Sequence, residues 1–249
     1  MSPFSLAYNE LLFRPLFNLL VGITNLLPGH NIGISILVVT LLVRLILLPV
    51  SWHQAKTMSK NQSKMGELKK ELDRINKKYK NNQSKKAEET MRLYKEAGVN
   101  PASGCLPLLI QLPILIALYR VFLTGTGPET FSFLYSFVSE PTAIQLYFLG
   151  INLASPSVLL ALMAGAFQLI SMRLISSTSA PSTPGDEKTA AMMASMQKNM
   201  AYIFPVMTVF ICLQIPAALA LYWVASTLFG IGQQYYLKKR LNTNNIPAL

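Results

Sequence analysis

Long apolar stretches dominate the sequence, and several approach or exceed the roughly 20 residues that a helix needs to cross a bilayer. Hydrophobic residues make up 51% of the 249 residues and charged residues only 13%, about half of the fraction that is usual in soluble proteins. This pattern predicts an all-α membrane protein. We expect five transmembrane helices, at residues 33–52, 104–123, 156–175, 199–214 and 217–237.

The distribution of Lys and Arg predicts the orientation, because these residues concentrate in cytoplasmic loops. Residues 53–100 contain thirteen Lys and Arg but only six Asp and Glu, whereas residues 124–155 contain no Lys or Arg. We therefore expect 53–100, the loop 176–198 and the short tail 238–249 to be cytoplasmic, and the loop 124–155 to be extracytoplasmic. With five spans, the amino terminus then lies outside.

Residues 1–32 are predicted to form an extracytoplasmic amphipathic helix that lies in the membrane interface. Their apolar residues recur at helical spacing, but Arg14, Asn18 and Asn25 interrupt the run, which argues against a span. The segment also lacks the basic start and the small-residue cleavage site of a signal peptide.

The basic segment 53–100 is predicted to form a cytoplasmic antiparallel helical hairpin. Coiled-coil spacing of apolar residues predicts its first helix, with the seam Met65, Leu68, Leu72, Ile75 and Tyr79. The polar residues 80–84 break the pattern, and the second helix is expected to carry one face made of Ala87, Met91 and Tyr94. The positive charge favours anionic lipids, ribosomal RNA or acidic clients as partners. A solvated spacer without a partner is the alternative.

Arg44 stands near the middle of the first predicted span, where an arginine costs roughly 2.5–3.5 kcal/mol. On a helix, Thr40, Arg44 and Ser51 share one side, so Arg44 is expected to face the inside of the bundle. No Asp or Glu lies inside any predicted span. The uncharged polar side chains that we expect to line the same space are Gln111, Gln168, Trp223, Ser226 and Thr227.

An unpaired charge among amides and hydroxyls implies water, so the sequence predicts a hydrated, positively charged cavity around Arg44. The alternative is that Arg44 bonds backbone carbonyl groups of a broken helix. A proline such as Pro49 would leave such carbonyl groups without their usual N–H partner.

Several chemistries lack their sequence signatures. Neither a GxxxxGK[ST] phosphate-binding loop nor a GxSxG nucleophile turn occurs. His30 and His53 lie on opposite sides of the first span, and the two cysteines show no metal-ligand spacing. We therefore expect no catalytic residue, no bound metal and no cofactor, and a protein that is not an enzyme of covalent chemistry.

Three stretches are similar to the YidC-type membrane protein insertases. LLVRLILLPVSWHQAKTMSKNQ (41–62) matches the first span of that family with its arginine, NPASGCLPLLIQLPILIALYRVF (100–122) matches the second, and IPAALALYWVASTLFGIGQQYYLKK (215–239) matches the last. The resemblance runs from about residue 10 to 240. The sequence resembles the short bacterial form of this family, which does not have the large extracellular domain.

The resemblance implies five transmembrane helices and a cytoplasmic hairpin between the first two. It also implies insertion and folding of newly made membrane proteins in the bacterial plasma (inner) membrane, alone or with the Sec translocon. Arg44 would line a groove that is open to cytoplasm and lipid, with Gln168 and Trp223 among its polar residues. The implied partners are nascent membrane proteins and anionic lipids, with the Sec translocon and the ribosome as further ones.

Two other functions fit the same residues. A small-solute or anion transporter would use Arg44 as its substrate anchor, although internal repeats, which many transporters have, are not visible. A scaffold protein would recruit partners through the hairpin and would not need Arg44.

Overall fold

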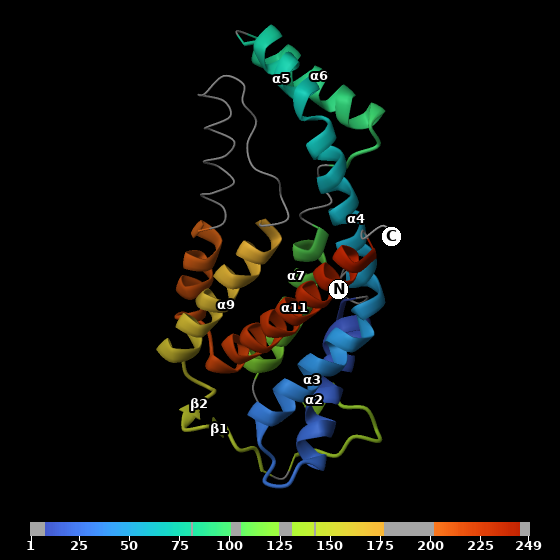
Figure 1. Cartoon of the computed structure of the whole chain (residues 1–249). Coiled ribbons are helices and arrows are strands. Elements are labelled where there is room, and N and C mark those ends of the chain that lie inside the picture. Colours follow the sequence, from blue (N-terminus) through green and yellow to red (C-terminus); the bar gives the residue numbers. More distant parts are fainter. Residues whose placement is uncertain are drawn as a thin grey trace.

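The computed structural model describes residues 8–80, 82–100, 106–124, 131–141, 143–176 and 202–244, most of them helical. Figure 1 shows a bundle of helices with a helical hairpin projecting from one end and a small β-hairpin at the opposite end. The mainly helical fold agrees with the predicted all-α class. The β-hairpin was not predicted, and the number of membrane spans stays a prediction.

The amino-terminal segment consists of a π-helical turn, η1 (Asn9–Phe13), which continues into α2 (Arg14–Leu26). Its apolar face packs inside the protein, against α3 (Ile32–Ile46) and α7 (Leu106–Thr124). The buried residues of that face are Phe13, Leu16, Phe17, Leu20 and Val21. The apolar face that suggested an interfacial helix is therefore covered by protein, and the position of this segment relative to a bilayer stays a prediction.

A tight turn reverses the chain between α2 and α3. Gly29 and His30 both have positive φ angles, of 78° and 48°. Asn31 then caps α3, because its side-chain oxygen accepts hydrogen bonds from the backbone N–H groups of Gly33 (3.0 Å) and Ile34 (3.2 Å).

The first predicted span, 33–52, is broken in the structure. Helix α3 ends at Ile46 and α4 (Leu48–Glu67) follows, with a bend of 57° between α3 and the first part of α4. Pro49 lies in the first turn of α4, where it lacks a backbone N–H and crowds the preceding turn, which explains the bend. Of the described helices, none is by itself both long and apolar enough to cross a membrane. Helix α3 and the first part of α4 together have the length and the apolar composition that a span needs.

The hairpin continues with α5 (Lys69–Lys78) and α6 (Gln83–Glu96), which pack against each other. Asn82 caps α6 by accepting a hydrogen bond from the backbone N–H of Lys85 (3.0 Å). Of the residues predicted to share one face of the second helix, Ala87 and Met91 are exposed and Tyr94 is half-buried. The side chain of Lys64 on α4 donates a hydrogen bond to the carbonyl oxygen of Ala97 (3.0 Å), directly after α6.

The remaining bundle helices are α7, α9 (Val158–Ser176), a helix at Tyr202–Cys212, and α11 (Ala217–Asn244). Helix α11 packs against α3, α7 and α9. It continues beyond residue 237, where we predicted the last span to end, because no glycine or proline stops the helix in the first part of the predicted tail 238–249. The predicted loop 176–198 lies outside the described residues, apart from Ser176.

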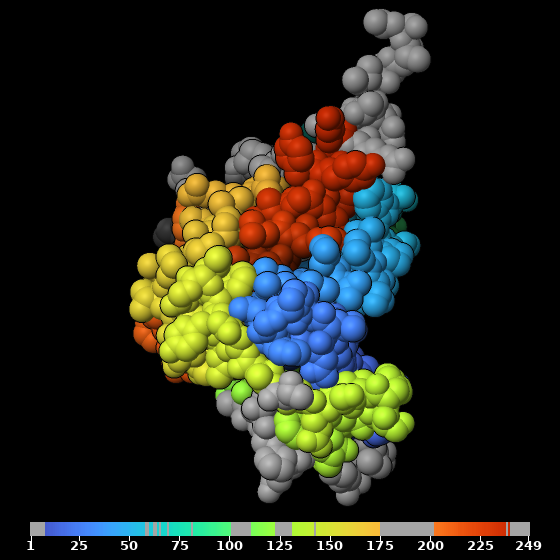
Figure 2. Space-filling view, turned by 90° about the horizontal axis from the view of Figure 1, so that it is seen from below, coloured from blue at the N-terminus to red at the C-terminus, as the bar shows by residue number. Residues whose placement is uncertain are grey.

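At the end opposite the helical hairpin, strands β1 (Tyr147–Phe148) and β2 (Ile151–Asn152) pair antiparallel. Figure 2, seen from this end, shows residues 143–154 beside the N-terminal helices and residues 131–141 near them. Asn18 of α2 is buried here and bonds the backbone of Phe133 (2.9 Å) and Tyr135 (2.7 Å). The loop 131–141 is thus attached to α2 by specific hydrogen bonds.

Candidate functional site

Arg44 lies in the last turn of α3 and is half-buried. Its Nε donates a hydrogen bond to the Ser226 hydroxyl of α11 (2.8 Å), and its Nη2 donates to the Gln111 side-chain oxygen of α7 (3.2 Å). Nη2 also contacts the Ser226 hydroxyl. Arg44 therefore joins three helices that are far apart in the sequence.

Gln111 connects Arg44 to a fourth residue, Tyr222. While its oxygen accepts from Arg44, its Nε2 donates to the Tyr222 hydroxyl. Tyr222 and Ser226 stand four residues apart on α11 and so share one face of that helix. Our sequence reasoning missed Tyr222, although its place one turn before Ser226 was a usable signal. We call Arg44, Gln111, Tyr222 and Ser226 the Arg44 cluster.

Among the residues that the structure describes, the guanidinium of Arg44 is surrounded by polar groups without negative charge. Within the described residues, no carboxylate pairs with Arg44. A guanidinium has five N–H donors, and the Nη1 group of Arg44 has no partner in the described part of the chain. The site can therefore bind water or a carboxylate without first breaking an ion pair.

The other predicted site residues lie around this cluster without joining it. Trp223 donates a long hydrogen bond (3.4 Å) to Gln168, which connects α11 to α9. Thr40 is only 2% exposed, and its hydroxyl donates to the Ile36 carbonyl of its own helix (2.6 Å). Thr227 is half-buried beside Ser226. The structure thus brings together Arg44, Gln111 and Ser226, and the groove role of all seven predicted residues stays a prediction.

A second polar contact to α11 comes from α4, further towards the helical hairpin. Gln233 of α11 donates to the Ser51 hydroxyl of α4 (2.8 Å). The ring of Trp52, the next residue of α4, lies 5.8 Å from the ring of Tyr236, and the Lys56 ammonium lies 5.9 Å from the Trp52 ring centre. Ser51 is on the polar side that the sequence predicted for the first span.

Arg120 is a second arginine inside a predicted span, and our sequence reasoning overlooked it. It lies on α7, donates to the Asn9 side-chain oxygen (2.8 Å), and stacks its guanidinium over Phe13 at 4.7 Å from the ring centre. An arginine in an apolar run is the same signal that drew attention to Arg44. Amide and aromatic contacts with η1 accommodate this charge.

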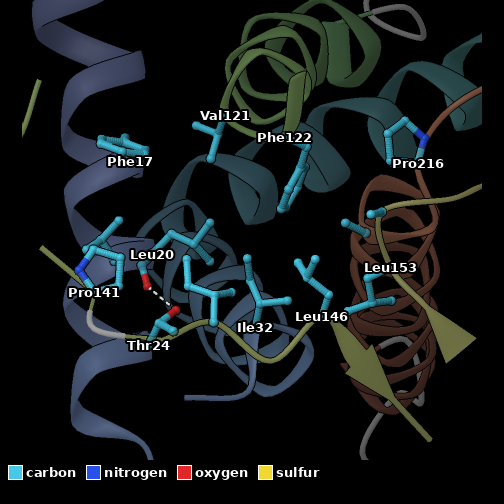
Figure 3. A pocket seen from close by; sticks show the side chains of 14 residues that line it. Phe17, Leu20, Thr24, Ile32, Val121, Phe122, Pro141, Leu146, Leu153 and Pro216 are labelled. Carbon is cyan, nitrogen blue, oxygen red and sulfur yellow. Dashed lines mark hydrogen bonds between the residues drawn. The ribbon is translucent and has the colours of Figure 1, made fainter. Parts of the chain in front are cut away.

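A cavity of about 160 Å³ lies near the β-hairpin end of the molecule. It lies between α2, α3, α7, the segment 141–154 and the start of α11. Figure 3 shows its lining of aliphatic and aromatic side chains, among them Phe17, Phe122 and Leu153. The Thr24 hydroxyl donates to the Leu20 carbonyl oxygen (2.7 Å) and is therefore satisfied. Because Arg44 is not in its lining, this cavity is not the predicted hydrated groove, which stays a prediction.

Comparison with known proteins gives consistent matches over most of the chain. The family described as "60Kd inner membrane protein" matches residues 23–244. A membrane protein insertase YidC of Fusobacterium nucleatum is 37% identical, over 84% of this chain and 87% of the relative. One from Clostridium tetani is 39% identical, over 87% and 85%. The membrane protein insertase MisCA of Bacillus subtilis is 31% identical, over 93% and 79%.

Proposed function

The chain belongs to the 60Kd inner membrane protein family, that of the YidC insertases, and from this premise we propose that it inserts newly made proteins into the bacterial inner membrane. The observation that carries the proposal is the charge of the Arg44 cluster, which three helices hold in place with no carboxylate partner among the described residues. Insertion makes or breaks no covalent bond, so the protein acts on its clients without being a chemical catalyst.

Arg44 attracts the polar tail of a client. A carboxylate on that tail can pair with the Nη1 group, which is unpaired in the described structure, while Gln111 and Ser226 hold the rest of the guanidinium. Water around Arg44 lowers the cost of bringing the tail partway into the membrane, because charged and polar groups stay solvated. Transfer of the client's apolar segment into lipid supplies the driving force.

The groove that receives the tail is proposed to run along α3, α9 and α11. The Arg44 cluster forms its charged part, and the contact between Gln168 and Trp223 lies on the side of α9. Thr227 is half-buried next to this line of residues. Thr40, with its hydroxyl bonded to its own helix, supports the packing of α3 beneath the groove.

The basic helical hairpin is proposed to face the cytoplasm, where its Lys and Arg residues meet anionic lipids and incoming clients. The ribosome and the Sec translocon are proposed as further partners on this path. The hairpin and the loops without Lys or Arg lie at opposite ends of the molecule (Figure 1), which supports this orientation.

The test is insertion of clients that differ only in the charge of the translocated tail, in vesicles that contain Arg44→Ala, Arg44→Glu or wild-type protein. A unit charge pair 4 Å apart is worth about 1 kcal/mol even in water, or about fivefold in rate. We expect insertion of acidic-tailed clients to fall by at least about fivefold with Arg44→Ala and further with Arg44→Glu. Neutral-tailed clients should change little.

Arg173 provides the matched control, because it is an exposed arginine near the end of α9. Arg173→Ala should insert both clients at the wild-type rate. Equal insertion of acidic-tailed clients by wild-type and Arg44→Glu protein would exclude the charge-attraction step.

A small-anion transporter is the alternative, since the Nη1 group of Arg44, which has no partner among the described residues, could anchor an anion. It predicts saturable anion flux through protein-containing liposomes and loss of that flux with Arg44→Ala. Normal client insertion by Arg44→Glu together with such flux would favour the transporter.

A further inference from the structure

The β1–β2 hairpin is held firmly against the bundle on one side. Phe148 packs so closely on Gly33 of α3 that a Cβ atom at Gly33 would overlap its ring. Asn31 donates a side-chain hydrogen bond to the Tyr147 carbonyl oxygen (2.9 Å), and the backbone N–H of Ile32 donates to Gln145 (3.1 Å). The hairpin therefore has a defined position, and its outward residues cannot turn inward.

Those outward residues are apolar. Tyr147 is 57% exposed and Leu149 is 85% exposed, whereas Phe148 between them faces α3. Successive residues of a strand point to opposite sides, so the inward contact of Phe148 directs Tyr147 outward. Leu149 is exposed as the first central residue of the turn.

Leu149 is also an unusual residue for its backbone conformation. The turn between the strands has positive φ at both of its central residues, 50° at Leu149 and 79° at Gly150. Two-residue turns of this kind strongly prefer Asn-Gly or Asp-Gly, because a larger side chain strains the left-handed region. In water, leucine at this position is unfavourable both for its backbone and for its exposed side chain.

The surroundings of the tip indicate what could make leucine favourable. The hairpin lies beside the start of α9 (Figure 1), where Val158, Leu159 and Leu162 are all more than half exposed. The loop 124–155 contains no Lys or Arg. The predicted span 156–175 overlaps α9, whose 19 residues extend about 28 Å, a little less than the roughly 30 Å of a hydrocarbon core. From the prediction that this segment crosses the membrane, it follows that a hairpin just before it lies at the depth of the interface.

We propose that the tip of the β1–β2 hairpin, Leu149 with Tyr147, inserts into the interfacial region of the extracytoplasmic leaflet of the inner membrane. It anchors this end of the bundle there. Lipid is the occupant that offsets both costs at Leu149, and tyrosine is a residue typical of that region. The anchor would fix the depth of α3 and α9, which it joins through Phe148 and the short segment after β2. It does not depend on any role of Arg44.

The test uses an environment-sensitive fluorophore in proteoliposomes. Leu149→Cys is labelled in a Cys105→Ala, Cys212→Ala background, and Glu140→Cys, an exposed polar position in the same loop region, is the matched control. We expect the label at 149 to be quenched by lipids with a shallow nitroxide and protected from aqueous iodide. The label at 140 should show the reverse.

Two outcomes overturn the proposal. Iodide quenching at 149 equal to that at 140 would place the tip in water. Protection from iodide without quenching by nitroxide lipids would mean that protein, a second copy or another subunit, covers the tip.

A second variant tests the residue itself. Leu149→Asn restores the preferred Asn-Gly turn, so the hairpin should stay folded while its anchor is lost. With the label at Tyr147→Cys, Leu149→Asn should abolish the nitroxide quenching and raise the iodide quenching to that of position 140. Unchanged quenching would exclude Leu149 as the anchor. Since neither readout measures client insertion, failure here leaves the proposed function untouched, and failure of the Arg44 experiment leaves the anchor untouched.

Discussion

Two arginines in apolar helices show how this protein accommodates charge at single residues. Arg44 donates to the side chains of Ser226 and Gln111, whereas Arg120 donates to Asn9 and stacks on Phe13. An arginine at a helix centre costs roughly 2.5–3.5 kcal/mol in a bilayer, so each needs such partners. The contacts of Arg120 pack η1 against α7, while the Nη1 group of Arg44 has no partner among the described residues.

Ser226 is the residue on which the position of Arg44 most depends. Its hydroxyl is buried and accepts from two nitrogens of the guanidinium. Hydrogen bonds to charged groups are worth about 1.5–3 kcal/mol, so Ser226→Ala should lower the free energy of unfolding by about that amount. Thermal or denaturant unfolding in detergent measures it. Ser171→Ala, at another buried serine, is the control, and an equal loss in both variants would contradict a special role for Ser226.

At the scale of elements, close contacts and helix ends decide the architecture. Pro49 divides the first predicted span into α3 and α4, and α11 continues to Asn244 because nothing in its sequence stops it. Gly165 lets α9 approach the helix Tyr202–Cys212, since a Cβ there would overlap the Val209 side chain and lie 3.2 Å from the Pro205 carbonyl oxygen.

Gly165→Ala should therefore destabilise the protein. The added methyl group must push the two helices apart, and overpacking of this kind costs about 1–3 kcal/mol. A lower melting temperature in detergent would report it. Gly230→Ala on α11, where nothing lies within 4 Å of the added carbon, should keep or slightly raise the melting temperature, because alanine favours helices. A harmless Gly165→Ala would show that this contact can relax.

At the scale of the whole molecule, charge is distributed unevenly from end to end. The basic hairpin projects at one end, the loops 131–141 and 143–154 cover the other, and the Arg44 cluster joins helices of the bundle between them. The apolar cavity of about 160 Å³ lies near the loop end. The two ends of the molecule therefore differ in charge, as the proposed entry of polar segments from the side of the helical hairpin requires.

This asymmetry predicts the orientation in the membrane. A membrane-impermeant thiol reagent added to intact cells should label Glu140→Cys and leave Lys85→Cys unlabelled, both in the Cys105→Ala, Cys212→Ala background. After the cells are opened, both positions should react, because both are exposed in the fold. Labelling of position 85 in intact cells would invert the proposed topology.

Composition and local spacing determined the helical class and the presence of Arg44 in an apolar run without Asp or Glu, because both are properties of single segments of the sequence. The tertiary structure alone decided which neighbours Arg44 has. Spacing placed Thr40 and Arg44 on one side of a helix, yet Thr40 bonds its own backbone while Gln111 and Ser226 reach Arg44. The reason is physical: periodicity defines the faces of a helix, but only packing between helices determines which faces meet.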